Sequence, residues 1–146
     1  MSAKGLESLQ VWQKARRFTV FVCREILPWF PREEKFALTQ QLRRAVQSIP
    51  ANISEAHGRY HFLDAVRFCY IARGSLDETL NHLIIAHDLH YISEDQLEDC
   101  REMWRDTYRL LHGYIEYLKR NVEVFKSYRM RDRDFMHDDY LLIPDP

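Results

Sequence analysis

Apolar residues recur at steps of three and four positions in four stretches of the chain, with polar residues between them. This spacing places the apolar side chains on one face of an α-helix. It therefore predicts four amphipathic helices, over residues 9–26, 31–58, 61–89 and 93–122. In the second stretch we expect the apolar face to begin at Phe36.

Residues with strong end preferences mark where these helices begin and end. Pro28 is expected to end the first helix and Pro31 to open the second, because proline fits the first turn of a helix but disrupts its interior. Gly58 is expected to end the second helix. Ser93 and Gln96 have the spacing of a capping box, in which each side chain accepts a hydrogen bond from the other residue's backbone N–H.

Four long helices joined by short links predict an all-α fold, an antiparallel up-down-up-down four-helix bundle. We assign this bundle domain to residues 1–125. Residues 126–146 combine mixed charges, a short apolar patch and prolines. They are expected to form a C-terminal tail that is loosely ordered or docks on a neighbour.

One proline falls inside a predicted helix. Pro50 has no backbone N–H and leaves the carbonyl of Val46 without its usual partner, and an interior proline costs about 3 kcal/mol. Ser48 and Asn52 are expected to satisfy nearby groups and, with Pro50, to form a fixed structural kink. Two geometries would produce such a kink. The helix either continues through Pro50, or it stops near Ile49 and restarts with Pro50 in its first turn.

The charge of the chain is nearly balanced but unevenly distributed. The 146 residues carry a net charge of −1, so no overall positive field indicates nucleic-acid binding. Residues 1–60, however, contain 10 Lys and Arg against 5 Asp and Glu, whereas residues 61–120 contain 7 against 11. Such a chain could bind an anionic partner through its basic half, or a copy of itself through both halves.

Cysteine usage and hydropathy indicate a compartment. The chain has only three cysteines, Cys23, Cys69 and Cys100, which lie far apart in the sequence. A small, odd number of cysteines favours free thiols over a disulfide framework. No apolar run approaches 18 residues, and no signal peptide opens the chain. We therefore expect a cytoplasmic protein without a membrane partner.

The seven histidines do not form a recognisable metal motif. No Glu is followed by His three positions later, as di-iron bundles require, and the HExxH pattern is absent. The patterns of serine hydrolases and of Gly-rich phosphate loops are also missing. We therefore expect no metal, no cofactor and no enzymatic activity.

Five basic residues of the first two predicted helices are the candidates for nucleic-acid binding, out of a wider basic set that also contains Arg24. They are Lys14, Arg16, Arg17, Arg43 and Arg44. Their charges could contact phosphates, and assembly of several copies would multiply those contacts. The alternative is that they are ordinary solvated side chains paired with Asp or Glu.

Several segments have recognisable counterparts in a known family. They include QLRRA at 41–45, SIPANI at 48–53 and IARGSLDE at 71–78. With them, residues 6–120 resemble the four-helix-bundle proteins encoded in 23S rRNA intervening sequences. In NISEAHGR, Ala56 stands where that family usually has Gly.

The resemblance implies an antiparallel four-helix bundle that assembles as a homopentamer, in a family whose members mostly have no known activity. The chain is also similar to the accessory variability proteins of diversity-generating retroelements, which bind a reverse transcriptase and nucleic acid through a basic surface. We therefore expect a non-enzymatic oligomeric scaffold that binds RNA, DNA or a nucleic-acid enzyme such as a reverse transcriptase. The alternatives are an assembly protein with no nucleic-acid role and an enzyme with a site between subunits.

Overall fold

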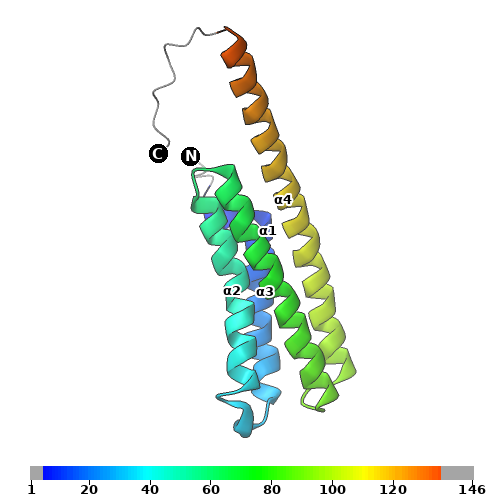
Figure 1. Cartoon of the computed structure of the whole chain (residues 1–146). Helices are drawn as coiled ribbons and strands as arrows, with labels where there is room; N and C mark the ends of the chain where they lie inside the picture. The colour runs from blue at the N-terminus through cyan, green and yellow to red at the C-terminus, as the bar shows by residue number, and fades with distance from the viewer. Residues whose placement is uncertain (1–4, 136–146) are drawn as a thin grey trace.

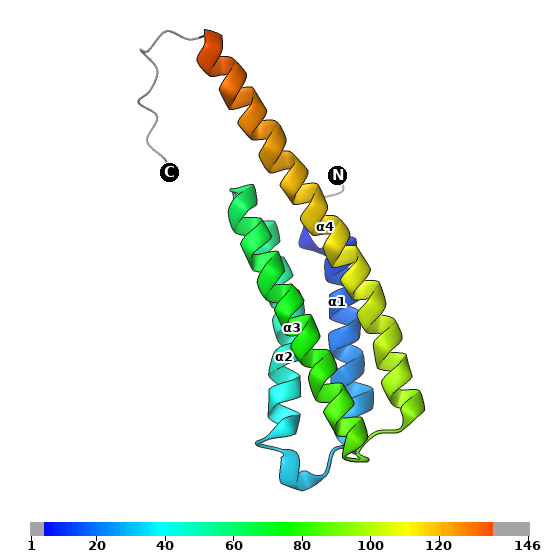
Figure 2. The same ribbon diagram turned by 45° about the vertical axis from the view of Figure 1, so that its right-hand side comes forward.

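The computed structural model describes residues 5–135. Four α-helices lie side by side, and consecutive helices run in opposite directions (Figures 1 and 2). The described residues contain no strand, so the predicted all-α four-helix fold is confirmed. The elements in chain order are the 3-10 turn η1 (Leu6–Ser8), α1 (Gln10–Phe21), the π-helical turn η2 (Val22–Ile26), the 3-10 turns η3 (Leu27–Trp29) and η4 (Arg32–Glu34), α2 (Leu38–Gly58), α3 (Phe62–Asp88) and α4 (Glu94–Phe135).

The core lies between the apolar faces of the four helices. Every helix contributes side chains that are almost completely buried, among them Phe18, Leu42, Ile53, Leu76, Leu83, Leu111 and Ile115. Removing apolar surface from water contributes about 25 cal/mol per Å², so this packing is the main term that holds the bundle together. The indole N–H of Trp104 also donates to the carbonyl of Leu76 at 3.0 Å, which fixes α4 against α3.

The second helix begins at Leu38 rather than at Pro31. The carboxylate of Glu34 accepts a hydrogen bond from the Leu38 N–H at 2.9 Å and another from the Tyr91 hydroxyl at 3.0 Å. This side chain accepts the first N–H of α2, and the helix does not extend back to Phe36. That residue is 81 % exposed, so its expected place on the apolar face is wrong.

The connection between α3 and α4 is fixed by hydrogen bonds at both helix ends. The predicted capping box is confirmed: the Gln96 N–H donates to Ser93 Oγ at 3.1 Å, and the Ser93 N–H donates to Gln96 Oε1 at 2.8 Å. The end of α3 is a Schellman motif, in which the Tyr91 N–H bonds to the Ala86 carbonyl at 2.9 Å. In this motif His90 has a φ of 62°, at the position usually taken by glycine.

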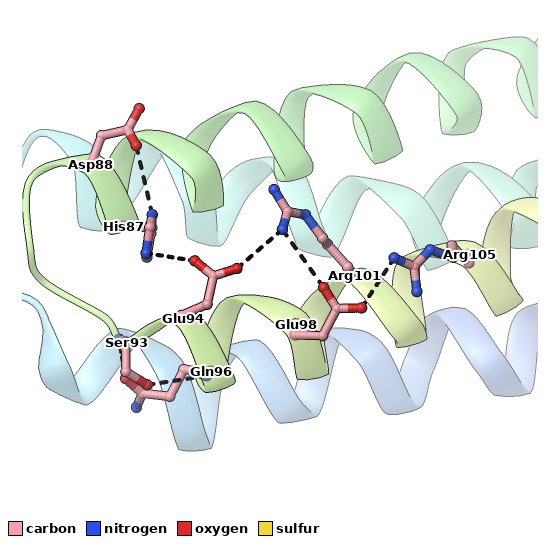
Figure 3. A network of polar contacts seen from close by, with 8 residues as sticks. All are labelled: His87, Asp88, Ser93, Glu94, Gln96, Glu98, Arg101 and Arg105. Carbon is pink, nitrogen blue, oxygen red and sulfur yellow. Dashed lines mark hydrogen bonds and ion pairs between the residues drawn. The ribbon is translucent and has the colours of Figure 1, made fainter.

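Alternating charges extend from the end of α3 along α4 (Figure 3). His87 Nε2 lies 2.9 Å from a carboxylate oxygen of Glu94. Arg101 contacts Glu94 at 3.5 Å and Glu98 at 3.6 Å, and Arg105 contacts Glu98 at 3.1 Å. The arginines of this part of α4 therefore have carboxylate partners within their own helix.

The fourth helix is longer than predicted and continues to Phe135, beyond the expected boundary at residue 125. No Gly or Pro interrupts the sequence between Gly113 and Pro144, so nothing local ends the helix at the expected place. Its C-terminal part projects past the ends of the other three helices (Figures 1 and 2). The rest of the predicted tail, residues 136–146, lies outside the described residues.

Candidate nucleic-acid interface

The proline-containing helix is continuous. α2 runs without a break from Leu38 to Gly58 with Pro50 inside it. Of the two geometries that the sequence left open, the structure therefore has the helix that continues through Pro50.

A threonine from the neighbouring helix replaces the N–H that Pro50 lacks. The hydroxyl of Thr19 on α1 lies 2.9 Å from the carbonyl oxygen of Val46 and also 2.9 Å from that of Ala15. The Ala15 carbonyl is four residues before Thr19 and can accept the helical N–H of that residue, whereas Val46 has no such donor. The Val46 carbonyl therefore depends more on this hydroxyl, and the bond ties α1 to the middle of α2.

The polar residues around Pro50 form a layer between α2 and α3. The hydroxyls of Ser48 and Ser75 are 2.8 Å apart. The side-chain N–H of Asn52 donates to the carbonyl of Ser48 at 2.8 Å and lies 2.9 Å from its hydroxyl. Ser48 and Asn52 thus satisfy each other and Ser75, which gives them a structural role in helix packing.

The outer face of α1 carries a shallow, open groove of about 700 Å³. Three exposed guanidinium groups line it, those of Arg16, Arg17 and Arg24. Its apolar walls come from Val20 and Phe21 of α1 and from Met103 of α4, and Glu7, Gln13 and Glu25 complete it. We call this feature the α1 groove. It combines positive charge with exposed apolar surface, since Val20 is 44 % exposed.

The arginines of the α1 groove make no ion pair within the described part of the chain. Among the residues whose side chains the structure describes, no carboxylate oxygen lies within 4.0 Å of Arg16, Arg17 or Arg24. Arg16 instead lies over the ring of Trp12, 5.6 Å from its centroid. Within the described side chains, these three arginines are therefore exposed and make no ion pair.

The structure separates the five sequence-predicted residues into different places. Arg16 and Arg17 share the α1 groove. Lys14 lies 3.9 Å from Asp106 of α4, so its charge is partly matched. Arg43 and Arg44 are exposed on α2, do not line the groove, and have no carboxylate partner in the described part of the chain.

Arg24 belongs to the groove and to the basic residues of the first predicted helix, but it was not among the five candidates. It follows Arg17 by seven positions, and such positions lie on nearly the same side of a helix. That spacing was the available signal. The π-helical turn η2, which contains Arg24, shifts the register by part of a turn and could not be read from the sequence.

Two of the three cysteines are deeply buried. Burial raises the pKa of the Cys69 thiol to about 12 and that of Cys100 to about 12, so both are neutral and unreactive near pH 7. Burial also raises the pKa of Cys23, against a smaller lowering by the charge of Arg43. Within residues 5–135, no three His, Cys, Asp or Glu side chains gather so as to hold a metal ion. No helix of the described part is long and apolar enough to cross a membrane.

Comparison with known proteins assigns the bundle to a family. The model of the 23S rRNA-intervening sequence protein family matches residues 7–113. The chain belongs to this family. The matched part contains α1, α2, α3 and the first half of α4, including the α1 groove and Pro50, whereas the projecting part of α4 lies outside it.

A solved structure supports the assignment. It is a 1.70 Å crystal structure of a protein of unknown function from the S23 ribosomal protein family of Bacteroides thetaiotaomicron VPI-5482. The two chains are 27 % identical with a TM-score of 0.66, over 72 % of this chain and 97 % of the other. No curated protein matches the chain significantly.

Proposed function

We propose that this family member is a non-enzymatic, oligomeric scaffold that binds the phosphate groups of RNA or DNA through the α1 groove. The observation that carries the proposal is a set of three exposed guanidinium groups, those of Arg16, Arg17 and Arg24, which have no carboxylate partner among the side chains that the structure describes. A phosphate can accept hydrogen bonds from two nitrogens of one guanidinium, so arginine suits this contact better than lysine does.

The physical driving force would be the release of counterions. Each phosphate that a cation neutralises frees condensed ions, so the affinity should fall steeply as salt increases. Three phosphate contacts to a single strand predict that the logarithm of the binding constant falls with the logarithm of the salt concentration at a slope of about −2.1. This slope corresponds to a roughly 18-fold loss of affinity between 50 and 200 mM salt. The described residues offer no recognition helix or other reader of base edges, so binding should depend little on sequence.

Assembly of several copies would strengthen such weak contacts. Three exposed apolar side chains share the outer face of α3, namely Leu63, Ile71 and Ile85, and the exposed Leu89 follows directly after the helix. A second copy could cover them, and the family resemblance favours a pentamer. Light scattering should then return about five times the 17.7 kDa of one chain. Linked copies would also bring several α1 grooves onto one strand.

The test is a titration of labelled single-stranded RNA at about 50 and 200 mM salt. The Arg16→Glu/Arg17→Glu variant should lose most of the binding and flatten the salt dependence. The matched control is Arg105→Glu/Arg109→Glu, which changes the charge equally but at exposed arginines that contact Glu98 and Asp106. If both variants weaken binding alike, only net charge matters and the groove is not the site. Absence of binding at 50 mM would leave an assembly protein without a nucleic-acid role.

A further inference from the structure

The end of the chain has the composition that the α1 groove would attract. Residues 136–146 read MHDDYLLIPDP, with three aspartates and no lysine or arginine. Four apolar residues, Tyr140 to Ile143, stand between Asp139 and Asp145. We propose that this acidic and apolar segment of one copy binds in the α1 groove of a second copy. The proposal goes beyond nucleic-acid binding and concerns what occupies the groove when no nucleic acid is present.

Both features of the segment have a counterpart in the groove. The groove offers the guanidinium groups of Arg17 and Arg24, which have no carboxylate partner among the described side chains, and its three arginines outnumber the two glutamates, Glu7 and Glu25, that also line it. It also exposes an apolar surface at Val20, beside Phe21 and Met103. Complementary charge selects the partner, and burial of apolar side chains adds affinity, so the two features together fit an acidic and apolar peptide.

The length of α4 excludes binding within one copy. Lys14, one turn from Arg17, contacts Asp106, which marks the level of the groove along α4. From Asp106 to Phe135 the helix rises about 44 Å, at 1.5 Å per residue. The chain from Phe135 to Leu142 spans at most about 25 Å even when fully extended. Figures 1 and 2 show this part of α4 projecting away from the other helices, so the groove that the segment reaches belongs to another copy.

This contact would regulate the groove. Carboxylates of the segment and phosphates of a nucleic acid would compete for the same guanidinium groups. In an assembly, the C-terminal segments of neighbouring copies are present at high local concentration around each groove. A short polyanion, which binds one groove at a time, should therefore displace them poorly, whereas a long polyanion that contacts several grooves should displace them effectively. The acidic segment would then limit non-specific binding to long or multiply contacting strands.

Photo-crosslinking of the full chain tests the proposal. Tyr140 is replaced by p-benzoylphenylalanine, the protein is irradiated, and covalently joined chains are separated on a denaturing gel. Crosslinking within one copy leaves the mass unchanged, whereas binding to a second copy gives a band of two chains. Mass spectrometry of that band should place the crosslinks at Val20, Phe21 or Met103.

Charge reversals supply the controls. Arg17→Glu/Arg24→Glu should lower the yield of joined chains roughly fivefold, because attraction becomes repulsion at exposed sites. Adding Asp138→Arg/Asp139→Arg should restore it, while Arg105→Glu/Arg109→Glu should leave it unchanged. Circular dichroism checks that each variant folds.

The proposal is overturned by any of three results: no two-chain band, crosslinks elsewhere, or a yield indifferent to the groove reversals. Excess RNA should abolish the band if the groove also binds nucleic acid. A band that persists in RNA would count against the proposed function and leave the contact between copies standing.

Discussion

Replacing Thr19 by valine tests how α2 tolerates Pro50. Valine has nearly the shape of threonine but lacks the hydroxyl, so the Val46 carbonyl would lose the donor that now lies 2.9 Å away. Val46 is completely buried, and water cannot easily replace that donor. Leaving a buried acceptor unsatisfied costs about 1–3 kcal/mol, and we expect Thr19→Val to lower the free energy of unfolding by this amount.

A double-mutant cycle separates this bond from other effects of the substitution. In Pro50→Ala, residue 50 regains an N–H that can donate to the Val46 carbonyl. Thr19→Val should then cost much less, which predicts a coupling energy of about 1–2 kcal/mol between Thr19 and Pro50. Effects of Pro50→Ala on the unfolded chain occur on both sides of the cycle and cancel.

The assay is urea unfolding followed by circular dichroism for wild type, both single variants and the double variant. All four must be measured at one protein concentration, because association changes apparent stability. Thr107→Val is the matched control. Thr107 is buried, whereas Thr19 is half-buried, and the Thr107 hydroxyl likewise donates to a carbonyl at 2.8 Å. That carbonyl belongs to Met103 of the same helix, which can also accept a backbone N–H. A Thr19–Pro50 coupling below about 0.3 kcal/mol would show that the reasoning is wrong.

Three further predictions follow from the helix ends and the buried acids. Ser93→Ala removes one half of the capping box and should lower the free energy of unfolding by about 1 kcal/mol in urea titrations, whereas an unchanged midpoint would mean that the cap contributes nothing. His90→Gly relieves a φ of 62° and should raise stability by about 1 kcal/mol; a loss would mean that contacts of the imidazole outweigh the strain. Burial raises the pKa values of Cys69, Cys100 and Tyr114 to about 12, so the unfolded chain releases these protons at lower pH than the folded chain does. Stability should therefore be fully present below pH 9 and fall as pH rises toward 12, and unfolding titrations at pH 8, 9.5 and 11 that show no decline would contradict this.

Local spacing was enough to predict most of the helices. The capping box at Ser93 and Gln96 could be read directly because both of its partners lie within four residues. The start of α2 could not. The apolar spacing continues back to Phe36, but the Glu34 side chain caps the helix at Leu38 and is itself held by Tyr91, which is 57 residues away in the chain.

The same limit applies to the polar residues around Pro50. The sequence identifies the Val46 carbonyl as the group that lacks a partner, since proline removes a known donor. It cannot identify Thr19 as the replacement, because that contact spans 27 residues and depends on how α1 packs against α2. The residues next to Thr19 in the sequence do not show whether its hydroxyl bonds to a carbonyl of another helix or to water.

The charge pattern predicted the basic surface, but the structure explains why that surface stays unneutralised. Residues 61–120 carry more acidic than basic side chains, and three of these carboxylates, those of Glu94, Glu98 and Asp106, contact arginines of α4 itself. Across the bundle, Asp106 reaches α1 and contacts Lys14. Among the described side chains, Arg16, Arg17 and Arg24 are thus left without an ion pair, although the carboxylates of Glu7 and Glu25 also line the α1 groove.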